Sequence, residues 1–361
     1  PISPAAREAA SGPADPPPRA EPKVRRPPSK VLVLAALALL VSGIAAYALI
    51  LQELQARSMA AGSRGPAILI TPFEFVGSDP SQSYLARGLT YQVIGTLTRF
   101  DDLFVYGSET SFGVQNADSS ATLEGITPDY VLTGSVQADK ARVRVSAILS
   151  DAKTSQYVWS STTEGDLTPS GLMRVNNDIA MNVATAIAQP YGLVFERKAQ
   201  EIATRPAGDL ASYECVVRFR QYWSSYSDRD GVRACLERSI AADPHYARAY
   251  SSLALLYVDT YRYGLGASQV SFDPLQRAAE LADKSIELAP NASNGYLAKS
   301  MALWFLHDVE GSIRVARRGL EINPYDTDLL ADLGLHLAVR ARWDKAMPLI
   351  EEAYGRNPGA P

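Results

Sequence analysis

The side chains that could do chemistry are few and scattered in this chain of 361 residues. Its histidines, His245, His307 and His336, are not paired at the spacing of metal ligands. No glycine-rich phosphate loop, nucleophile elbow or HExxH motif is present. Asp101-Asp102 is a pair of carboxylates before an expected strand, where a solvated loop is a simpler interpretation than a metal or acid–base site. The sequence therefore predicts no catalytic residue, no metal site and no cofactor, and hence no enzyme in this chain.

The chain contains two cysteines, Cys215 and Cys235, too few for a disulfide scaffold or a Cys-rich metal site. Both fall in one expected helical hairpin, whose turn lies near residues 227–230. In an oxidising compartment they would form a disulfide that closes a loop of about 20 residues. The alternative is that they are two small, buried, apolar residues.

A long apolar segment sets the predicted topology. Residues 31–51 carry neither charge nor proline, and a helix of this length would be roughly 30 Å long, enough to cross a bilayer core. A buried soluble helix and a cleaved signal peptide are the alternatives, although the apolar part of a signal peptide is shorter. The positive-inside rule puts the N-terminus in the cytoplasm and the C-terminal region in the periplasm. The basic residues that precede the segment are Arg19, Lys23, Arg25, Arg26 and Lys30.

The segments around the predicted span support three further expectations. Residues 1–30 are rich in proline and begin without Met, which favours a disordered cytoplasmic linker that follows a missing output domain. Residues 52–66 form a spacer. Small residues recur every four positions in the span and predict a homodimer through it, although alanine is common in such segments; they are Ala38, Ser42 and Ala46. The predicted protein is single-pass in the inner membrane, with the lipid bilayer as a partner.

Residues 67–195 are expected to fold as one domain that contains a mixed sheet and helices. Two short apolar runs are typical of buried strands, and an amphipathic helical stripe lies between them. Three segments of alternating apolar and polar residues then predict an antiparallel meander, and a final amphipathic helix would cover its apolar face. In chain order these elements are residues 67–71, 81–100, 103–106, 130–137, 141–149, 155–161 and 170–189.

This region resembles a known family. The runs TPFEFVGSDPSQSYLARGLT, LFVYGSETSF and YVLTGSV are similar to the TolB-N-like, or FlgO-like, domain. The resemblance implies a domain that often follows a membrane helix and precedes tetratricopeptide repeats in bacterial signalling proteins. It also implies an upstream output domain, either a CadC-like winged-helix DNA-binding domain or an adenylate/guanylate cyclase domain.

Residues 206–361 are expected to form an array of about four repeats. Pro290, Pro324 and Pro358 recur at a spacing of 34 residues, a period that indicates stacked helical units. Small residues at the expected helix crossings, Gly334, Ala346 and Ala353, make residues 325–358 resemble the tetratricopeptide pattern, and the previous repeat has Ser300, Ser312 and Gly319 at these places.

The resemblance to tetratricopeptide repeats also implies where a ligand would bind. The first helix of each repeat lines a concave face, so particular positions of these helices are expected to contact a protein or peptide. Among them Met301, Trp304 and Phe305 are unusually large and apolar for a solvated groove, and aromatic residues dominate protein interfaces. Packing of these side chains against a neighbouring repeat is the alternative. The full predicted set is Arg248, Leu255, Asn294, Leu297, Met301, Trp304, Phe305, Asp328 and Leu335.

The predicted fold class is α+β and all-α, with one transmembrane helix, a mixed α/β sandwich domain that is TolB-N-like, and an α-solenoid of tetratricopeptide repeats. The net charge of −4 gives no sign of a nucleic-acid partner. The predicted function is the anchor and periplasmic protein-binding sensor of a bacterial signalling protein that controls transcription or adenylate cyclase. A cell-envelope assembly scaffold without an output domain, and an enzyme with its site in residues 67–195, are the alternatives.

Overall fold

The computed structural model describes residues 65–77, 79–115, 127–139, 141–187, 192–266 and 271–357. All of them belong to one compact unit, Leu54–Pro361. The predicted linker and the apolar segment 31–51 lie outside the described residues, as does most of the predicted spacer.

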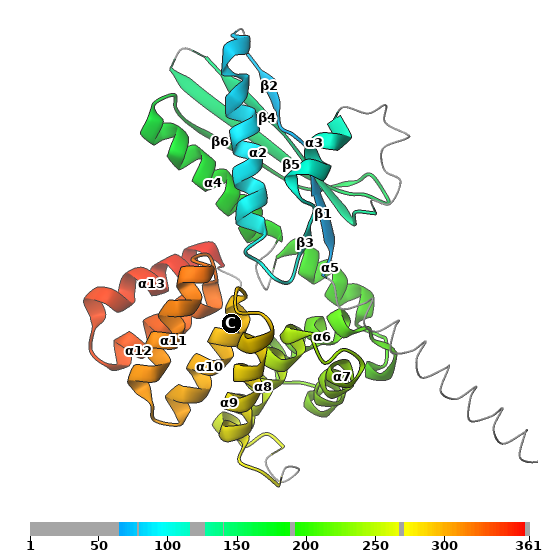
Figure 1. The fold of residues 1–361 in the computed structure, drawn as a ribbon, viewed down its shortest axis with the longest axis vertical. Helices are drawn as coiled ribbons and strands as arrows, with labels where there is room; N and C mark the ends of the chain where they lie inside the picture. The colour runs from blue at the N-terminus through cyan, green and yellow to red at the C-terminus, as the bar shows by residue number, and fades with distance from the viewer. Residues whose placement is uncertain are drawn as a thin grey trace, which may run out of the picture. The chain divides into compact units, whose positions relative to one another are not determined.

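The predicted fold class and localisation, which both include a membrane-spanning helix, are wrong. Within the described ranges, no helix combines the length and the apolar character needed to cross a bilayer. The longest helix there, α4 (Pro169–Ile187), carries Arg174 and Asp178 and buries a stripe of side chains against a sheet. The structure has mostly helices and one small sheet, as Figure 1 shows.

The sheet has six strands in the part of the chain that the structure describes. Its order is β3-β1-β4-β5-β6, and β2 also pairs with β4. Strand β1 runs parallel to β3 and β4, and helix α2 (Tyr84–Leu97) lies between the early strands and β3 in sequence, as a parallel crossover requires. The strands are β1 (Ala67–Ile70), β2 (Glu74–Val76), β3 (Phe104–Val105), β4 (Tyr130–Ala138), β5 (Arg142–Asp151) and β6 (Tyr157–Asp166).

Strands β4, β5 and β6 form an antiparallel meander. In β5 the side chains of Val143, Val145 and Leu149 are buried, whereas Arg142 and Arg144 on the opposite face are exposed. This alternation follows the two-residue period of a strand and leaves one face of the sheet for helices to cover.

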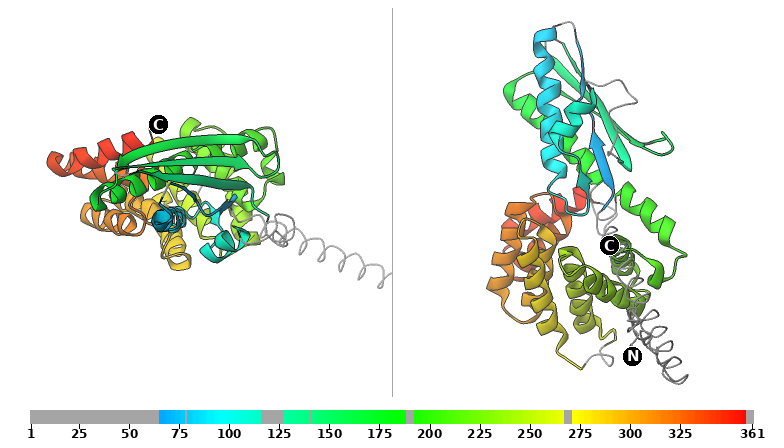
Figure 2. Two further views of the ribbon diagram at one scale, coloured as in Figure 1. Left: turned by 90° about the horizontal axis from the view of Figure 1, so that it is seen from above. Right: turned by 45° about the vertical axis from the view of Figure 1, so that its right-hand side comes forward.

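Helices α2 and α4 cover the apolar face of the sheet. Figure 2 shows both helices on the same side of the strands, and Gln92 of α2 donates a hydrogen bond to Asn177 of α4 over 2.7 Å. Helix α4 buries Ile179, Val183 and Ile187 at a spacing of four residues. Each such side chain contributes roughly 1.5–3 kcal/mol when it leaves water. Two shorter helices, α3 (Ser108–Gln115) and α5 (Leu193–Ile202), complete this region.

The rest of the described chain folds into helical hairpins. They are α6 (Ser212–Ser225) with α7 (Arg229–Ala242), α8 (Ala247–Tyr263) with α9 (Pro274–Leu288), α10 (Ser293–Phe305) with α11 (Val309–Ile322), and α12 (Thr327–Val339) with α13 (Trp343–Arg356). Aspartates cap several of these helices: Asp273, Asp308 and Asp326 accept hydrogen bonds from backbone N–H groups of the first turn. Each cap stabilises its helix by about 1 kcal/mol, so the sequence specifies where these helices begin.

Small residues allow the paired helices to cross closely. Ser300, Ser312 and Ala346 are fully buried at these crossings. A Cβ atom added at Gly319 would lie 2.9 Å from both Leu329 Cδ2 and Tyr296 Cβ. Because these side chains occupy little volume, the paired helices can pack closely at these positions.

The crossing at Gly319 supplies a test of the repeat packing. We expect Gly319→Leu to lower stability by about 1–3 kcal/mol, because the new side chain must displace packed neighbours. Gly355→Leu is the matched control, since a Cβ atom there has nothing within 4 Å and a helical glycine replaced by leucine gains up to about 1 kcal/mol. Urea midpoints of the two variants measure the difference, and equal midpoints would contradict the close crossing.

Candidate concave-face binding site

The residues predicted to bind a partner fall into three groups in the structure. Leu255 and Leu297 lie in the core of the helical hairpins, where they support the fold and do not reach a ligand. Arg248, Asn294 and Asp328 occupy the first turns of α8, α10 and α12 and already have polar partners within the chain. The third group is apolar and lies toward the other ends of α10 and α12; it comprises Met301, Trp304, Phe305 and Leu335.

Arg248 holds a carboxylate that comes from the sheet region. Its Nε lies 2.6 Å from Asp102 Oδ1, and its Nη2 lies 2.9 Å from Asp102 Oδ2. A bidentate contact of this kind is among the strongest interactions that an arginine makes. The Arg248 side chain is 3% exposed, so water does not screen the pair effectively.

The neighbouring contacts hold the same turn. We call residues 99–103, between α2 and β3, the acidic turn. Asn294 donates a hydrogen bond to Asp101 Oδ1, and Arg99 Nη1 donates one to the carbonyl oxygen of Ile322 over 2.9 Å. Helices α8, α10 and α11 thus each contribute a polar contact to this turn.

The two carboxylates of the acidic turn have different partners, since Arg248 binds Asp102 and Asn294 donates to Asp101. Asp101 is an exposed residue overall, yet the loss of water around its carboxyl group, together with the charge of Asp102, raises its pKa to about 6. Arg248 and the hydrogen bond from Asn294 oppose this rise. Asp102 is therefore held by an ion pair and Asp101 by a hydrogen bond.

Asp328 has a different partner. Its Oδ2 lies 2.6 Å from Nη1 of Arg220, a nearly buried residue of α6. The pair joins the first described hairpin to the last. Arg248, Asn294 and Asp328, which we call the polar end of the concave face, are thus all occupied by groups of the same chain.

The apolar end of the face is open by comparison. Leu335 is 55% exposed and Val339 63% exposed on α12. Met301 and Phe305 hold the equivalent positions one 34-residue period earlier, on α10, and are partly buried. We call these four residues the apolar end. The two exposed aliphatic side chains of α12, next to the partly buried Met301 and Phe305, form an apolar surface of the kind found at protein contacts.

Trp304 stacks on a buried polar network. Its ring lies 4.0 Å from the ring of His336. Ser312 Oγ lies 2.9 Å from His336 Nδ1, and His336 Nε2 lies 3.3 Å from Asp332 Oδ1. A serine, a histidine and an aspartate in this order are the groups of a nucleophilic triad. Because Ser312 is fully buried, no substrate carbonyl can reach its hydroxyl, and the network serves to join the last two hairpins.

Two of these groups have shifted pKa values because they are buried. Burial raises the pKa of Asp332 to about 7, against the hydrogen bond from Ser300, and lowers the pKa of His336 to about 4. The folded pair and the unfolded pair therefore carry the same number of protons between about pH 4.5 and 6.5, although they hold them on different groups.

The two cysteines lie on facing helices of the first hairpin. Cys215 of α6 and Cys235 of α7 form a disulfide in the structure, with Cα atoms 5.5 Å apart. Both side chains are fully buried. The bond ties the two helices of this hairpin together.

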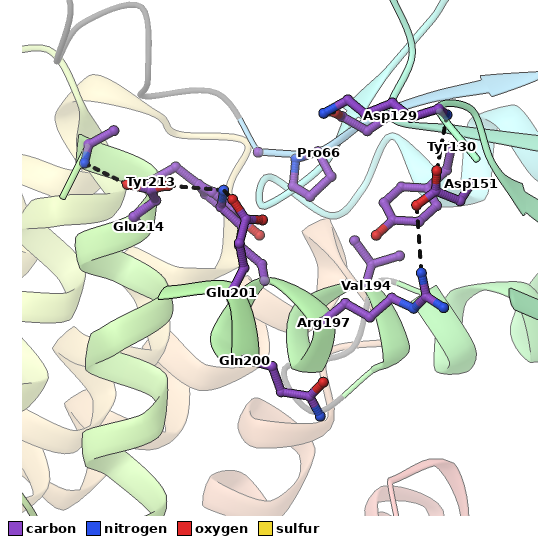
Figure 3. Close-up of a pocket in the computed structure, with 14 residues that line it drawn as sticks. Pro66, Asp129, Tyr130, Asp151, Val194, Arg197, Gln200, Glu201, Tyr213 and Glu214 are labelled. Atoms are coloured by element: carbon purple, nitrogen blue, oxygen red, sulfur yellow. Dashed lines mark hydrogen bonds and ion pairs between the residues drawn. The ribbon is translucent and has the colours of Figure 1, made fainter. Parts of the chain in front are cut away.

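A pocket that sequence analysis missed lies near α5. Its volume is about 740 Å³, and it is lined by the start of β4, the end of β5, α5 and the first turn of α6. Figure 3 shows Arg197 directed toward Asp151, an ion pair of 3.6 Å. Lys198 lies 2.9 Å from Glu214, so ion pairs hold these charged groups. No pattern in residues 192–202 signals such a site.

Within the ranges described, no group of three or more His, Cys, Asp or Glu side chains is arranged to hold a metal ion.

Comparison with known proteins gives a partial match. No family model matches the chain. It is 25% identical over 250 residues to a protein of Rhizobium meliloti (strain 1021) named putative adenylate cyclase 3. The match covers 68% of this chain and 41% of that protein, so the chain spans less than half the length of this curated relative.

Two solved structures show partial likeness. TTC0263, a thermophilic TPR protein of Thermus thermophilus, is 15% identical, with a TM-score of 0.35 over 52% of this chain and 88% of that chain. MamA is 13% identical, with a TM-score of 0.30 over 46% and 87%. These likenesses carry no argument about function. The helical hairpins support a tetratricopeptide-like solenoid. The TolB-N-like and CadC-like assignments are not confirmed. Neither a periplasmic location nor a role in transcription is supported.

The disulfide yields a prediction about the isolated protein. We expect no free thiol when the monomer, purified without reductant, is denatured and titrated with a thiol reagent. Replacing both cysteines by alanine should lower stability by roughly 3 kcal/mol, because the sulfur atoms close a loop between residues 20 apart. A reduced sample that titrates two thiols is the control, and two free thiols before reduction would exclude the bond.

The polar network yields a prediction about pH. A raised Asp332 pKa means that its contribution to stability is lost as the pH rises from about 4 to about 7. A lowered His336 pKa means that its contribution is lost as the pH falls from about 6.5 to about 4. Between pH 4.5 and 6.5 these slopes, each at most about 1.4 kcal/mol per pH unit, cancel in the wild type.

Single variants separate the two slopes. We expect the stability of Asp332→Asn, measured by urea unfolding, to rise with pH over this window, because the His336 slope remains. That of His336→Gln should fall with pH, because the Asp332 slope remains. Parallel curves for the two variants would show that the burial of these groups does not shift their pKa values in opposite directions.

Proposed function

We propose that this chain is the protein-binding region of a bacterial signalling protein with a nucleotide-cyclase output. The observation that carries the proposal is the exposed apolar end of the concave face, above all Leu335 and Val339. Solvent-exposed side chains of this kind lose contact with water when a partner binds, and that burial favours association.

The division of the concave face supports a binding role over a catalytic one. The polar end is filled by groups of the same chain, and the one described arrangement of Ser, His and Asp is closed to substrates. The apolar end presents repeated positions on neighbouring helices, which is how helical repeat arrays offer an extended surface to a partner.

The signalling part of the proposal rests on the curated relative. Its name supports a cyclase output rather than a DNA-binding one. The sheet region contacts the repeats, because the acidic turn is bound to them through the Arg248–Asp102 pair. A partner that binds the repeats would therefore alter the contacts of the sheet region as well.

Site-specific photo-crosslinking tests the binding surface. With p-benzoylphenylalanine in place of Leu335 in the full-length protein, we expect a discrete crosslinked partner in cells. The adduct should be lost when Val339→Glu is added. The same label at Tyr157, which is 78% exposed on β6, is the control. No adduct at position 335, or the same adduct at both positions, would overturn the surface.

A second measurement tests the output. In the full-length protein, Leu335→Glu/Val339→Glu should change the rate of cyclic nucleotide formation several-fold, whereas Tyr157→Glu should leave it unchanged. A specific adduct together with an unchanged output would favour a scaffold over a sensor.

A further inference from the structure

We propose that the acidic turn is an internal ligand of the concave face, and that an external peptide with two adjacent acidic residues competes with it for the polar end. This inference rests on the proposed function, since it assumes that the face binds a peptide. It adds the chemistry of the peptide and the group that must leave before the peptide binds.

The contacts at the polar end are those of ligand recognition. Arg248 binds one carboxylate in a bidentate ion pair, and Asn294 donates a hydrogen bond to the carboxylate of the adjacent residue. The acceptor residues lie 146 and 193 positions away in sequence from these donors. A peptide of another chain could present the same two carboxylates in the same way.

Arg248 also retains binding capacity. Its Nη1 is buried and has no hydrogen-bond partner in the structure, and the whole side chain is 3% exposed. A buried guanidinium N–H without an acceptor is unfavourable, because it has lost its hydrogen bonds to water. The acidic turn therefore fits the site incompletely, and a peptide that also offered an acceptor to Nη1 would bind there more favourably.

The two ends of the face together define the partner. The polar end selects two adjacent carboxylates, while Leu335 and Val339 at the apolar end favour apolar side chains elsewhere in the same segment. The preferred ligand is thus a segment that carries an acidic pair together with apolar residues. The acidic turn meets this description in part, since Leu103 and Phe104 follow Asp102.

The experiment tests whether a peptide with the sequence of the acidic turn competes with the turn itself for the polar end. The probe is a fluorescein-labelled peptide of residues 98–104, Thr-Arg-Phe-Asp-Asp-Leu-Phe, and its control carries Asn-Asn at the acidic positions. Binding to the chain is followed by fluorescence anisotropy. Asp101→Asn/Asp102→Asn in the chain keeps the shape of the turn and removes the charges that hold it.

We expect the peptide to bind this double variant at least tenfold more tightly than it binds the wild type, whose site is occupied. Adding Arg248→Gln should abolish the gain, and the Asn-Asn peptide should bind no protein tightly. Glu74→Gln/Glu196→Gln removes the same charge from exposed positions and should bind like the wild type. Equal binding to the wild type and the double variant, or equal binding of both peptides, would overturn the proposal.

Hydrogen–deuterium exchange on the wild type gives an independent readout if the double variant folds poorly. Saturating peptide should increase exchange in residues 99–103, and no change there would also overturn the internal-ligand model. Crosslinking at Leu335 that persists when the peptide experiments fail would leave the binding function intact and remove only this inference. Loss of that crosslink would remove the proposed function itself.

Discussion

The buried ion pair between Arg248 and Asp102 is the interaction that joins the two kinds of structure in this chain. A guanidinium that is 3% exposed must have a charged partner, because an isolated buried charge costs several kcal/mol. The repeats supply the arginine and the sheet region supplies the carboxylate, so neither part satisfies this charge alone. The need to pair this charge explains why the turn between α2 and β3 lies against the repeats. It also explains why groups of the same chain occupy the polar end of the concave face.

The helical hairpins depend on a second constraint, which is the room available where helices cross. Small side chains such as Ser300, Ser312 and Gly319 let the helices approach closely. Because serine is polar, each buried hydroxyl then needs a partner. Ser300 donates to Asp332, and Ser312 bonds to His336. Close packing therefore leads to the polar network, and the network in turn positions His336 beneath the ring of Trp304.

The sequence alone determined where most of the longer helices and strands of the described chain lie, although no pattern in it predicted β2, α3 or α5. The alternation in residues 141–149 marks β5, and the prolines at a 34-residue spacing mark the hairpins. Such patterns are visible in sequence because each element buries one face of its own short segment. The alternation also indicated correctly that one face of the meander would be covered. The prediction of a membrane-spanning helix came from a different pattern and is corrected. Among the described residues, no helix is long and apolar enough to cross a bilayer.

Only the tertiary structure decided which predicted site residues are available. Repeat position placed Arg248, Asn294 and Leu335 on the same kind of helix, yet the first two are held by the acidic turn and the third is exposed. Arg99, the nearest basic residue, bonds to the carbonyl oxygen of Ile322, and Asp101-Asp102 looked like a solvated loop in the sequence. Its partners lie more than a hundred residues away, and a contact of that range arises from the packing of whole elements, which no local pattern encodes.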